Sequence, residues 1–471
     1  MSRYLAALAK IQPRGPDHVV YKLEKKIFAA QTVLAITGDP GWYAQPRRDF
    51  LSYNGEIYNY KNFGNYSTDT ELVHETVVSK SQHRWKLFQG PWAWAWTDFD
   101  SLAYACDPQG ERCLYHYQDN DILIVSSEVS AILTLVQCEQ HIPPYSNKGW
   151  TMISQTPWQG VTRCEPGQLY QDGIVIGKLD SLFDWITDTG PNSIQDALDE
   201  FESVWTQGCA VMTPAEPATL SYSGGIDSTL IARHIKDLEL LAIDIIGKDP
   251  IVDQLTCRKI AVDFESWAKY YRHIIELTRM PAQSWSHVGK WLVAKHANNR
   301  IIFTGLAADE LFGGYDVYQK LQYTVEHSTS PYSHWDHDNL WPTCLEVYQG
   351  DPKQATLLMD YWYQVVGVDA PGLDRLGGAC GKETRNPFML KSVIQFALNL
   401  PWHLKVSNPA KPVLRRFLQG SYQGKIDTKR GFAGHANDSL PWLGVVVTCN
   451  GDRHRDWQNI AQTTFIEYTN G

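Results

Sequence analysis

Several features that mark particular classes of protein are missing from this chain. Its nine cysteines are scattered, with no C-x-x-C pair and no histidine and cysteine cluster at zinc-site spacing. Free thiols in a reducing compartment are therefore the favoured interpretation. No long basic run occurs, and 52 acidic residues outnumber 42 basic ones, for a net charge of −10. Because phosphate binding needs clustered Lys or Arg, nucleic acid is not expected to be the main partner.

Export and membrane signals are missing as well. The first residues, MSRYLAALAK, contain a short apolar patch but neither a signal-peptide core nor a cleavage site. No apolar run approaches the ~18 residues needed to span a bilayer. We therefore expect a cytoplasmic protein without a membrane partner. The chain also lacks internal repeats and low-complexity segments.

The composition that remains is ordinary for a globular protein, with 43% apolar and 20% charged residues. A length of 471 residues exceeds the roughly 250–300 at which a single core stops growing, so two domains are expected. The 18 tryptophans indicate aromatic-rich cores or pockets without identifying a ligand.

The first 180 residues contain short β-prone segments broken by Asn, Asp, Gly and Pro, including DFLSYNGEIYNY, PWAWAWTDFD and QLYQDGIVIGKL. This pattern predicts stacked antiparallel sheets, with one helix over residues 2–11. The pattern changes near Gly190 and Pro191, where Ser193 is a candidate N-cap for a helix.

Beyond that point, helical stretches alternate with the strand candidates PATLSY, LELLAIDIIG and RIIFTG. Such alternation is typical of a mostly parallel, doubly wound sheet, here followed by a helical C-terminal part. The fold class is therefore a two-domain α/β protein. We expect domain boundaries at residues 1–185 and 190–471.

The segment SGGIDST, residues 223–229, lies between a predicted strand and the helical LIARHIKDL. Ser223, Gly224, Gly225 and Ser228 are the residues expected to hold pyrophosphate, because glycines admit a ligand close to the backbone and a helix N-terminus attracts anions. Asp227 could hold a magnesium ion. A Walker A lysine loop is absent. The alternative is a glycine-rich turn without a ligand.

A second acidic motif follows another strand in RIIFTGLAADELFGGY, residues 300–315. Open α/β sheets bind ligands at the C-terminal ends of their strands. Asp309 could thus share one magnesium ion with Asp227, with phosphate oxygens and waters as further ligands. The alternative is a pair of unrelated capping aspartates.

The segment SYNGEIYNY, residues 52–60, allows two interpretations. Asn54-Gly55 between β-prone segments favours a type I′ hairpin turn. The same residues could instead form a pocket that stabilises developing negative charge, which is useful only beside a nucleophile.

Together these motifs resemble the asparagine synthetase family, including relatives such as β-lactam synthetase that have abandoned glutamine hydrolysis. The resemblance rests on SGGIDS, ADELFGGY, ETRNPFM, KPVLRRF and KRGFAG in the second domain. In the first domain it rests on RGPDH, YNGEIYNY, TDTEL, CDPQGERCLYHY and SSEVSAI. It implies an N-terminal-nucleophile (Ntn) amidotransferase-like fold, followed by an ATP-pyrophosphatase-type synthetase domain. It further implies Lys429 as the catalytic lysine.

The chain departs from the family pattern at its start. In the family, Asn54 and Gly55 would form an oxyanion hole for an N-terminal cysteine, but no cysteine precedes Cys106. Val33 occupies the place of the arginine that holds the glutamine carboxylate. Asn54, Gly55, Glu56 and Asp69 are retained, so the resemblance implies a degenerate glutaminase domain kept as a scaffold. Ser2 is a less favoured replacement nucleophile, because its α-amine would have to be aligned as the base.

A second departure lies in the synthetase half, where Leu306 replaces the family's acidic residue or tyrosine. The function expected is an ATP- and magnesium-dependent ligase that adenylates a small-molecule carboxylate and transfers it to ammonia or an amine, without glutaminase activity. The alternatives are a nucleotide-binding regulatory protein without turnover and a tRNA-modifying adenylating enzyme. The sequence leaves open a homodimer and a separate protein that supplies ammonia.

Overall fold

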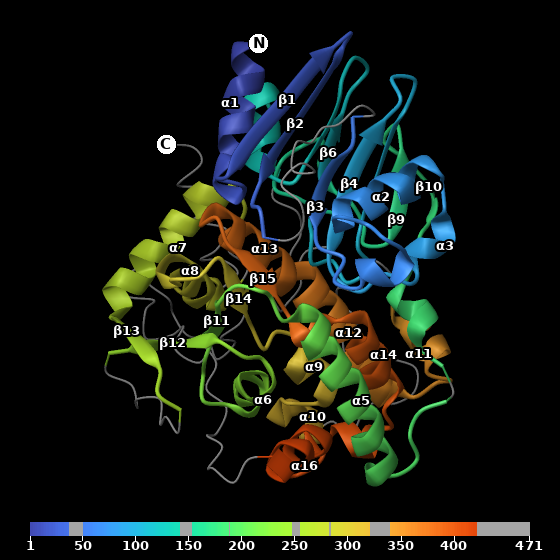
Figure 1. Cartoon of the computed structure of the whole chain (residues 1–471), viewed down its shortest axis with the longest axis vertical. Helices are drawn as coiled ribbons and strands as arrows, with labels where there is room; N and C mark the ends of the chain where they lie inside the picture. Colours follow the sequence, from blue (N-terminus) through green and yellow to red (C-terminus); the bar gives the residue numbers. More distant parts are fainter. Residues whose placement is uncertain are drawn as a thin grey trace.

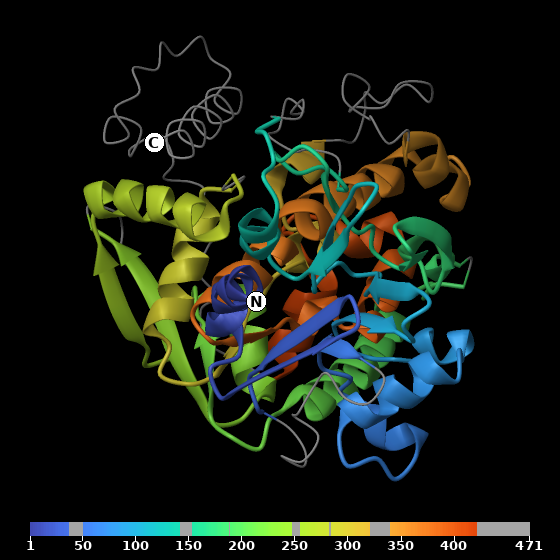
Figure 2. The same cartoon turned by 90° about the horizontal axis from the view of Figure 1, so that it is seen from above.

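The computed structural model describes residues 1–36, 50–141, 153–187, 189–246, 255–281, 284–320 and 340–421. In Figure 1 the N-terminal strands occupy the upper part of the molecule, and the parallel sheet with its helices occupies the lower part. From above, helix α1 and the first hairpin lie over the middle of the molecule, between the parallel sheet on one side and α2 and α3 on the other (Figure 2).

The N-terminal half contains antiparallel sheets. Its strands are β1 (His18–Glu24), β2 (Ile27–Val33), β3 (Ser52–Gly55), β4 (Trp92–Thr97), β5 (Leu102–Cys106), β6 (Tyr115–Gln118), β7 (Leu123–Ser126), β8 (Val161–Arg163), β9 (Gln168–Gln171) and β10 (Ile174–Lys178). They form a β1–β2 hairpin, a sheet in the order β10-β9-β5-β4-β3 and a sheet in the order β7-β6-β8. The helices are α1 (Ser2–Ile11), α2 (Asp69–Val78), α3 (Gln82–Trp85) and α4 (Val129–Leu135). The predicted antiparallel sheets and the predicted first helix are confirmed.

The second half is built on a parallel sheet, as predicted. Its strands are β11 (Ala218–Ser221), β12 (Leu238–Ile245), β13 (Arg258–Val262), β14 (Ile301–Phe303) and β15 (Glu383–Arg385). Their order is β13-β12-β11-β14-β15, and all four pairings are parallel. The strand order reverses direction between β11 and β14, and open α/β sheets bind ligands at such a switch point.

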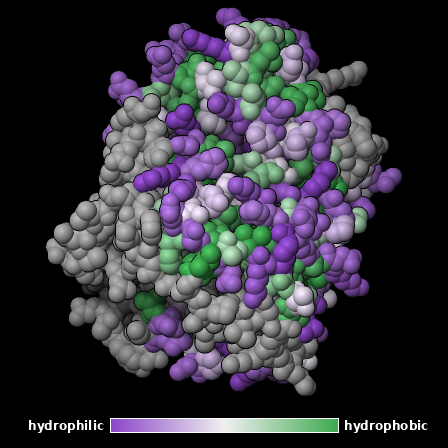
Figure 3. All heavy atoms as spheres, turned by 90° about the vertical axis from the view of Figure 1, so that its left-hand side faces the viewer, coloured by the Kyte–Doolittle hydropathy of each residue, from purple (hydrophilic) through white to green (hydrophobic). Residues whose placement is uncertain are grey.

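Helices cover this sheet and form the C-terminal part of the described chain. They are α5 (Ile194–Met212), α6 (Ile226–His234), α7 (Phe264–Thr278), α8 (Ser286–His296), α9 (Ala308–Phe312), α10 (Asp316–Lys320), α11 (Leu340–Val347), α12 (Pro352–Asp360), the π-helix η5 (Tyr361–Asp369), α13 (Ala370–Ala379), α14 (Lys391–Asn399), α15 (Trp402–Lys405) and α16 (Pro412–Ser421). Within the described residues, no helix is long and apolar enough to cross a membrane. Hydrophilic residues cover much of the face shown in Figure 3, with smaller apolar patches among them.

Helix α5 shows how local sequence sets the fold. The Ser193 hydroxyl accepts a hydrogen bond from the Asp196 amide at 3.1 Å, so the predicted N-cap is confirmed. Ala197, Phe201 and Trp205 are buried at a spacing of four residues, which places one helical face in the core of the second half. The tryptophans also build the N-terminal core, where Trp85 stacks on Trp94 with ring centroids 5.5 Å apart.

Buried polar contacts join the two halves. Arg385 of β15 donates to Glu56 at 2.6 Å, and Arg14 after α1 donates to Asp374 of α13 at 2.6 Å. Asn386 donates to Glu111 at 2.6 Å. The first two pairs are ionic, and buried ions are costly unless paired. The two halves are therefore joined by a buried interface that contains paired polar groups.

Candidate functional site

The SGGIDS loop lies at the C-terminal end of β11, where the sequence predicted a pyrophosphate site. Gly224 has φ +72°, a conformation that side chains with a Cβ rarely adopt. Ser228 ties the loop together, because its hydroxyl lies 3.1 Å from the Ser223 hydroxyl and donates to the Gly225 carbonyl at 3.2 Å. Helix α6 begins at Ile226, so its first N–H groups and positive dipole end face the loop. This arrangement suits an anion, but the pyrophosphate role of these residues stays a prediction.

The structure brings Asp227 and Asp309 together around one cation. The ammonium of Lys411 lies 2.6 and 2.7 Å from the two carboxylate oxygens of Asp227 and 2.7 Å from Asp309 Oδ1. Burial lowers the pKa of the Lys411 ammonium. The contacts with Asp227 and Asp309 raise it by a larger amount, so the pKa lies above its ordinary value. Lys411 is therefore a buried cation at neutral pH.

Glycines keep the space around these carboxylates open. A Cβ on Gly314 would lie 1.9 Å from Asp309 Oδ1 and 2.4 Å from the Lys411 side chain. A Cβ on Gly305 would lie 3.1 Å from the Asp227 Cβ. Two carboxylates that converge on one cation position, with backbone kept close by glycine, form a donor set of the kind magnesium uses. The residues present thus fit the predicted metal, whose assignment stays a proposal.

A cavity of about 380 Å³ extends from this cluster. Its residues come from the SGGIDS loop, the ends of β12 and β14, α8, the π-helix and α16. Beside the cluster, the Tyr315 hydroxyl donates to Glu310 at 2.5 Å. Burial raises the pKa of Tyr315 well above its ordinary value, and Glu310 and Asp309 add to this rise. Arg415 of α16 also lines the cavity, so two basic residues of KPVLRRF reach it.

Leu306 lines the same cavity, half-buried, in the loop after β14. Its amide donates to the Thr304 hydroxyl at 3.3 Å, and Thr304 in turn donates to Asn386 at 2.5 Å. The side chain itself offers no group that can accept a proton. Any base in this half must therefore come from another residue.

Sequence reasoning missed Lys411 as a site residue. The signal available was the position of KPVLRRF among the basic motifs of the second half. Its approach to Asp227 depends on a chain separation of 184 residues, which no local pattern encodes. The predicted catalytic Lys429 and the KRGFAG motif lie outside the described residues.

In the N-terminal half, Asn54 and Gly55 end strand β3, and the predicted hairpin interpretation is wrong. Asn54 does not have the positive φ that a type I′ turn requires. Strand β3 pairs with β4, which is distant in the sequence, and not with the residues immediately after Gly55. A Cβ on Gly55 would lie 2.3 Å from the Pro91 carbonyl oxygen, so close approach of the chains explains this glycine.

Asp69 is buried beneath the same strand. It accepts hydrogen bonds from the Tyr53 hydroxyl at 2.8 Å and the Ile57 amide at 3.0 Å. Burial raises the pKa of Asp69 to about 6, although these hydrogen bonds oppose the rise. Burial also raises the pKa of Glu56 well above its ordinary value, with Arg385 opposing it. Glu56 and Asp69 therefore belong to a buried polar cluster.

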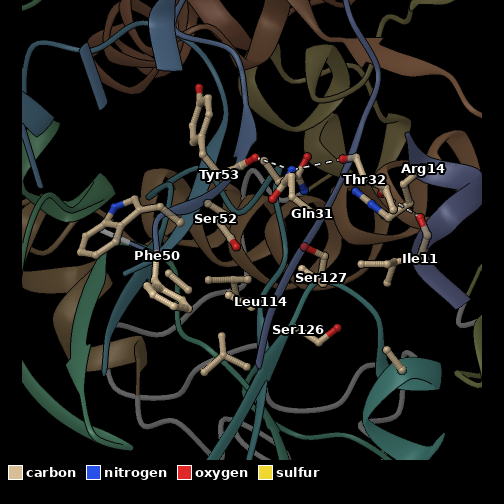
Figure 4. A pocket seen from close by; sticks show the side chains of 18 of the residues that line it. Ile11, Arg14, Gln31, Thr32, Phe50, Ser52, Tyr53, Leu114, Ser126 and Ser127 are labelled. Carbon is tan, nitrogen blue, oxygen red and sulfur yellow. Dashed lines mark hydrogen bonds between the residues drawn. The ribbon is translucent and has the colours of Figure 1, made fainter. Parts of the chain in front are cut away.

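A second cavity, of about 550 Å³, adjoins Asn54, Gly55, Glu56 and Asp69. Every residue of β2 and of β7 lines it. Successive side chains of a strand alternate between its faces, so a cavity lined by all of them runs along the strand edge. Figure 4 shows the Gln31 side chain between β2 and β3, where it donates to the Tyr53 carbonyl at 2.8 Å.

Strand β15 separates the two cavities. Glu383 lines the N-terminal cavity and Thr384 lines both. Arg385, the next residue, donates to Glu383 at 2.8 Å as well as to Glu56. One three-residue strand thus forms a common wall between the N-terminal pocket and the synthetase-half cavity.

Comparisons with known proteins match both halves of the chain. A family model described as asparagine synthase matches residues 212–426, and one described as glutamine amidotransferase domain matches residues 2–175. Asparagine synthetase [glutamine-hydrolyzing] 1 of Bacillus subtilis is 23% identical over 348 residues, covering 65% of this chain and 55% of the relative. Amidase chyE of Penicillium rubens is 21% identical over 373 residues, covering 68% and 54%. The chain spans about half the length of these two relatives.

Among solved structures, the allosteric regulatory enzyme of purine biosynthesis matches 59% of this chain and 75% of that chain, at 14% identity. Its TM-score of 0.26 is too low to support any inference.

Proposed function

We propose that the chain is a member of the asparagine synthetase-like family and acts as an ATP-dependent ligase that forms an amide without hydrolysing glutamine itself. The observation that carries this proposal is the convergence of Asp227 and Asp309 beside the SGGIDS loop, at the switch point of the parallel sheet. Family members use ATP. The anion-attracting loop next to a cation-binding carboxylate pair suits a nucleoside triphosphate.

In the first step, a substrate carboxylate attacks the α-phosphorus of ATP, and the bond to pyrophosphate breaks. Ser223, Gly224, Gly225 and Ser228 would hold the departing pyrophosphate with hydroxyl and backbone groups. Asp227 and Asp309 would hold magnesium, which supplies charge neutralisation at the phosphates when bound. Lys411, kept cationic by these carboxylates, would add a positive charge beside the metal position.

In the second step, the nitrogen of ammonia or an amine attacks the acyl carbon. The acyl–oxygen bond to AMP breaks, and the nitrogen loses a proton. Lys429 would stabilise negative charge as it gathers on the phosphate and then on the tetrahedral carbon. A fixed donor at such a point contributes on the order of 3–4 kcal/mol to transition-state stabilisation.

ATP–pyrophosphate exchange across a panel of carboxylic acids tests the function. We expect at least one acid to support exchange, and Lys429→Met to keep ATP binding while slowing amide formation on the order of a hundredfold. Lys295→Met, an exposed lysine on α8, is the control. A Lys429→Met enzyme within about twofold of wild-type kcat would remove this residue from the mechanism.

The absence of glutaminase activity is a separate part of the proposal. It is supported by the enclosure of Glu56 and Asp69 in a buried cluster. Release of glutamate from glutamine, lost on Ser2→Ala, would contradict it.

A second candidate function is a nucleotide-binding regulatory protein. Leu306 in the cavity favours it, because leucine supplies no acid or base to the reaction. Magnesium-dependent ATP binding without exchange for any acid would establish this alternative over the ligase.

A further inference from the structure

The N-terminal cavity lies between the open edges of two strands. Strand β2 pairs with β1 on one side only, and β7 ends the sheet ordered β7-β6-β8. Within the described residues, no strand pairs with the second edge of β2 or of β7. Every residue of both strands lines the same cavity, of about 550 Å³. Both open edges therefore border one space, which we call the β2–β7 gap.

The register of β1 and β2 shows which backbone groups of β2 face this gap. In an antiparallel pair, every second residue bonds to the partner strand, and the residues between direct their N–H and C=O groups to the other side. Glu24 and Ile27 flank a two-residue turn, so they form a hydrogen-bonded pair, and the next such pair on β2 is at Ala29. The N–H and C=O groups of Phe28 and Ala30 therefore point away from β1 and toward the gap.

Strand β7 presents its backbone in the same way. The Asp119 amide donates to the Ile122 carbonyl at 3.1 Å beside the β6–β7 hairpin, so the hydrogen-bonded pairs include Ile124 and alternate from there. Leu123 and Val125 consequently direct their N–H and C=O groups away from β6. In the described part of the chain, those of Val125 meet no partner from the protein. The gap is thus bordered by backbone donors and acceptors on both sides.

The charge pattern separates the gap from an ordinary exposed edge. Proteins protect an open edge with charged side chains, often lysine, or with proline, so that it does not pair with other chains. Strand β1, HVVYKLE, follows this rule with Lys22 and Glu24. Strands β2, IFAAQTV, and β7, LIVS, contain neither a charged residue nor proline. The outer edge of the hairpin is therefore protected, whereas the two edges at the gap have the composition of strands that are paired on both sides.

Both faces of the gap are covered. On one face the Tyr4 ring of α1 stacks on Phe28, with ring centroids 4.8 Å apart, and α1 packs against α4, which covers β7. On the other face the Gln31 side chain donates to the Tyr53 carbonyl of β3 (Figure 4). Apolar side chains of these layers, including Leu8 of α1, line the space. A strand placed in the gap would therefore be buried between a helix layer and a second sheet.

We propose that the β2–β7 gap binds an extended, uncharged segment of another polypeptide, which adds a strand that pairs with both edges. Peptides that add to a sheet edge gain affinity from main-chain hydrogen bonds, while side-chain pockets give specificity. Charge complementarity decides the partner here, because a charged side chain between two covered faces would lose its water without gaining a partner from either strand. The seven residues of β2 and the four of β7 set the length of the segment. This site is separate from the synthetase-half cavity and does not rest on the ligase function.

Calorimetry with a defined peptide tests the proposal on the whole chain. The probe is an acetylated and amidated peptide of about seven alternating valine and threonine residues, the length of β2, with one lysine at each end for solubility. Two further peptides carry N-methyl groups, one on the odd-numbered and the other on the even-numbered residues of this stretch. In an extended chain the N–H groups of these two sets point in opposite directions, so each methylated peptide loses its hydrogen bonds to one edge only.

We expect the unmodified peptide to bind with one-to-one stoichiometry, and each methylated peptide to bind more weakly by roughly tenfold or more. Each lost main-chain hydrogen bond weakens binding by roughly twofold to tenfold, and each methylated peptide loses more than one. A peptide that pairs with a single exposed edge elsewhere on the protein would tolerate one of the two methylation patterns. Unchanged affinity for either methylated peptide would therefore overturn the proposal.

A proline substitution on β2 tests whether the peptide binds in the gap. Ala30→Pro removes a gap-facing N–H without removing a bond to β1, and should weaken binding of the unmodified peptide by roughly tenfold or more. Val19→Pro is the matched control on the same hairpin, because the Val19 N–H points to the outer edge of β1 and the residue is 42% exposed. It should bind the peptide within about twofold of wild type. Equal binding by the two variants would contradict the location, and the methylated peptides test wild type even where a proline variant fails to fold.

Amide hydrogen exchange distinguishes a separate polypeptide from the other occupants. When the peptide is added, the Ala30 and Val125 amides should exchange more slowly by roughly tenfold or more. If these amides already exchange slowly in a peptide-free monomer, another part of this chain fills the gap. If their slow exchange is lost when a dimer dissociates, a second copy fills it. Either result, or the absence of peptide binding, overturns the proposal.

Discussion

Substitution of Gly314 by alanine tests the cation cluster with a single methyl group. The added Cβ would lie 1.9 Å from Asp309 Oδ1 and 2.4 Å from the Lys411 side chain, whereas real Cβ contacts are essentially never below 3.0 Å. The Asp309 carboxylate must therefore move by about 1.1 Å. Both obstructing atoms belong to the outer parts of side chains, so the backbone can stay in place while the cation position is displaced.

A displacement of about 1 Å at a reacting centre can cost on the order of a hundredfold in rate, whereas overpacking costs about 1–3 kcal/mol of stability. We thus expect Gly314→Ala to lose about a hundredfold in ATP–pyrophosphate exchange while its melting temperature falls by only a few degrees. Gly177→Ala is the matched control, because nothing lies within 4 Å of its Cβ position. Exchange in Gly314→Ala within about threefold of wild type would refute the assignment of this cluster to the reaction.

Three further predictions concern charged groups. Asp227→Asn should weaken magnesium-dependent ATP binding, and equal affinities by calorimetry at fixed magnesium would contradict this. The pKa of Asp69 is raised to about 6, so its protonation stabilises the fold fully below pH ~4, and this contribution is lost as pH rises through about 6. The unfolding free energy of Asp69→Asn minus that of wild type should accordingly increase by up to about 3 kcal/mol between pH 4 and pH 7. A difference that does not change with pH would contradict this prediction. Arg385→Met should cost about 3–5 kcal/mol in denaturant unfolding, because it leaves buried carboxylates unpaired, and adding Glu56→Gln should recover part of the loss.

Local signals predicted much of the architecture. The Ser193 cap, the four-residue spacing of buried residues in α5, and the apolar strands β11, β12 and β14 each depend on a few neighbouring residues. The SGGIDS loop was placed between a strand and a helix for the same reason. Strands β13 and β15 were not predicted, because their short segments carry charged residues and show no clear alternation.

Contacts between distant residues could not be derived in this way. Lys411 meets Asp227 across 184 residues, and Lys290 meets Asp369 across 79. The π-helix depends on hydrogen bonds to the fifth residue, for which the sequence carries no periodic signal comparable to that of an amphipathic α-helix. The Asn54-Gly55 pair misled the turn prediction, because packing against Pro91 and not turn geometry requires that glycine.

The three-residue wall β15 has a consequence for exchanging parts of this protein with a relative. Arg385 needs Glu56, Asn386 needs Glu111, and each pair is buried with one member from either half. A chimera that joined this synthetase half to a foreign N-terminal half would leave the Arg385 guanidinium without its Glu56 acceptor and the Asn386 amide without its Glu111 acceptor. We thus expect the two halves to be inherited together. Recombination at the boundary between them should give a folded protein only when both members of each pair come from the same parent.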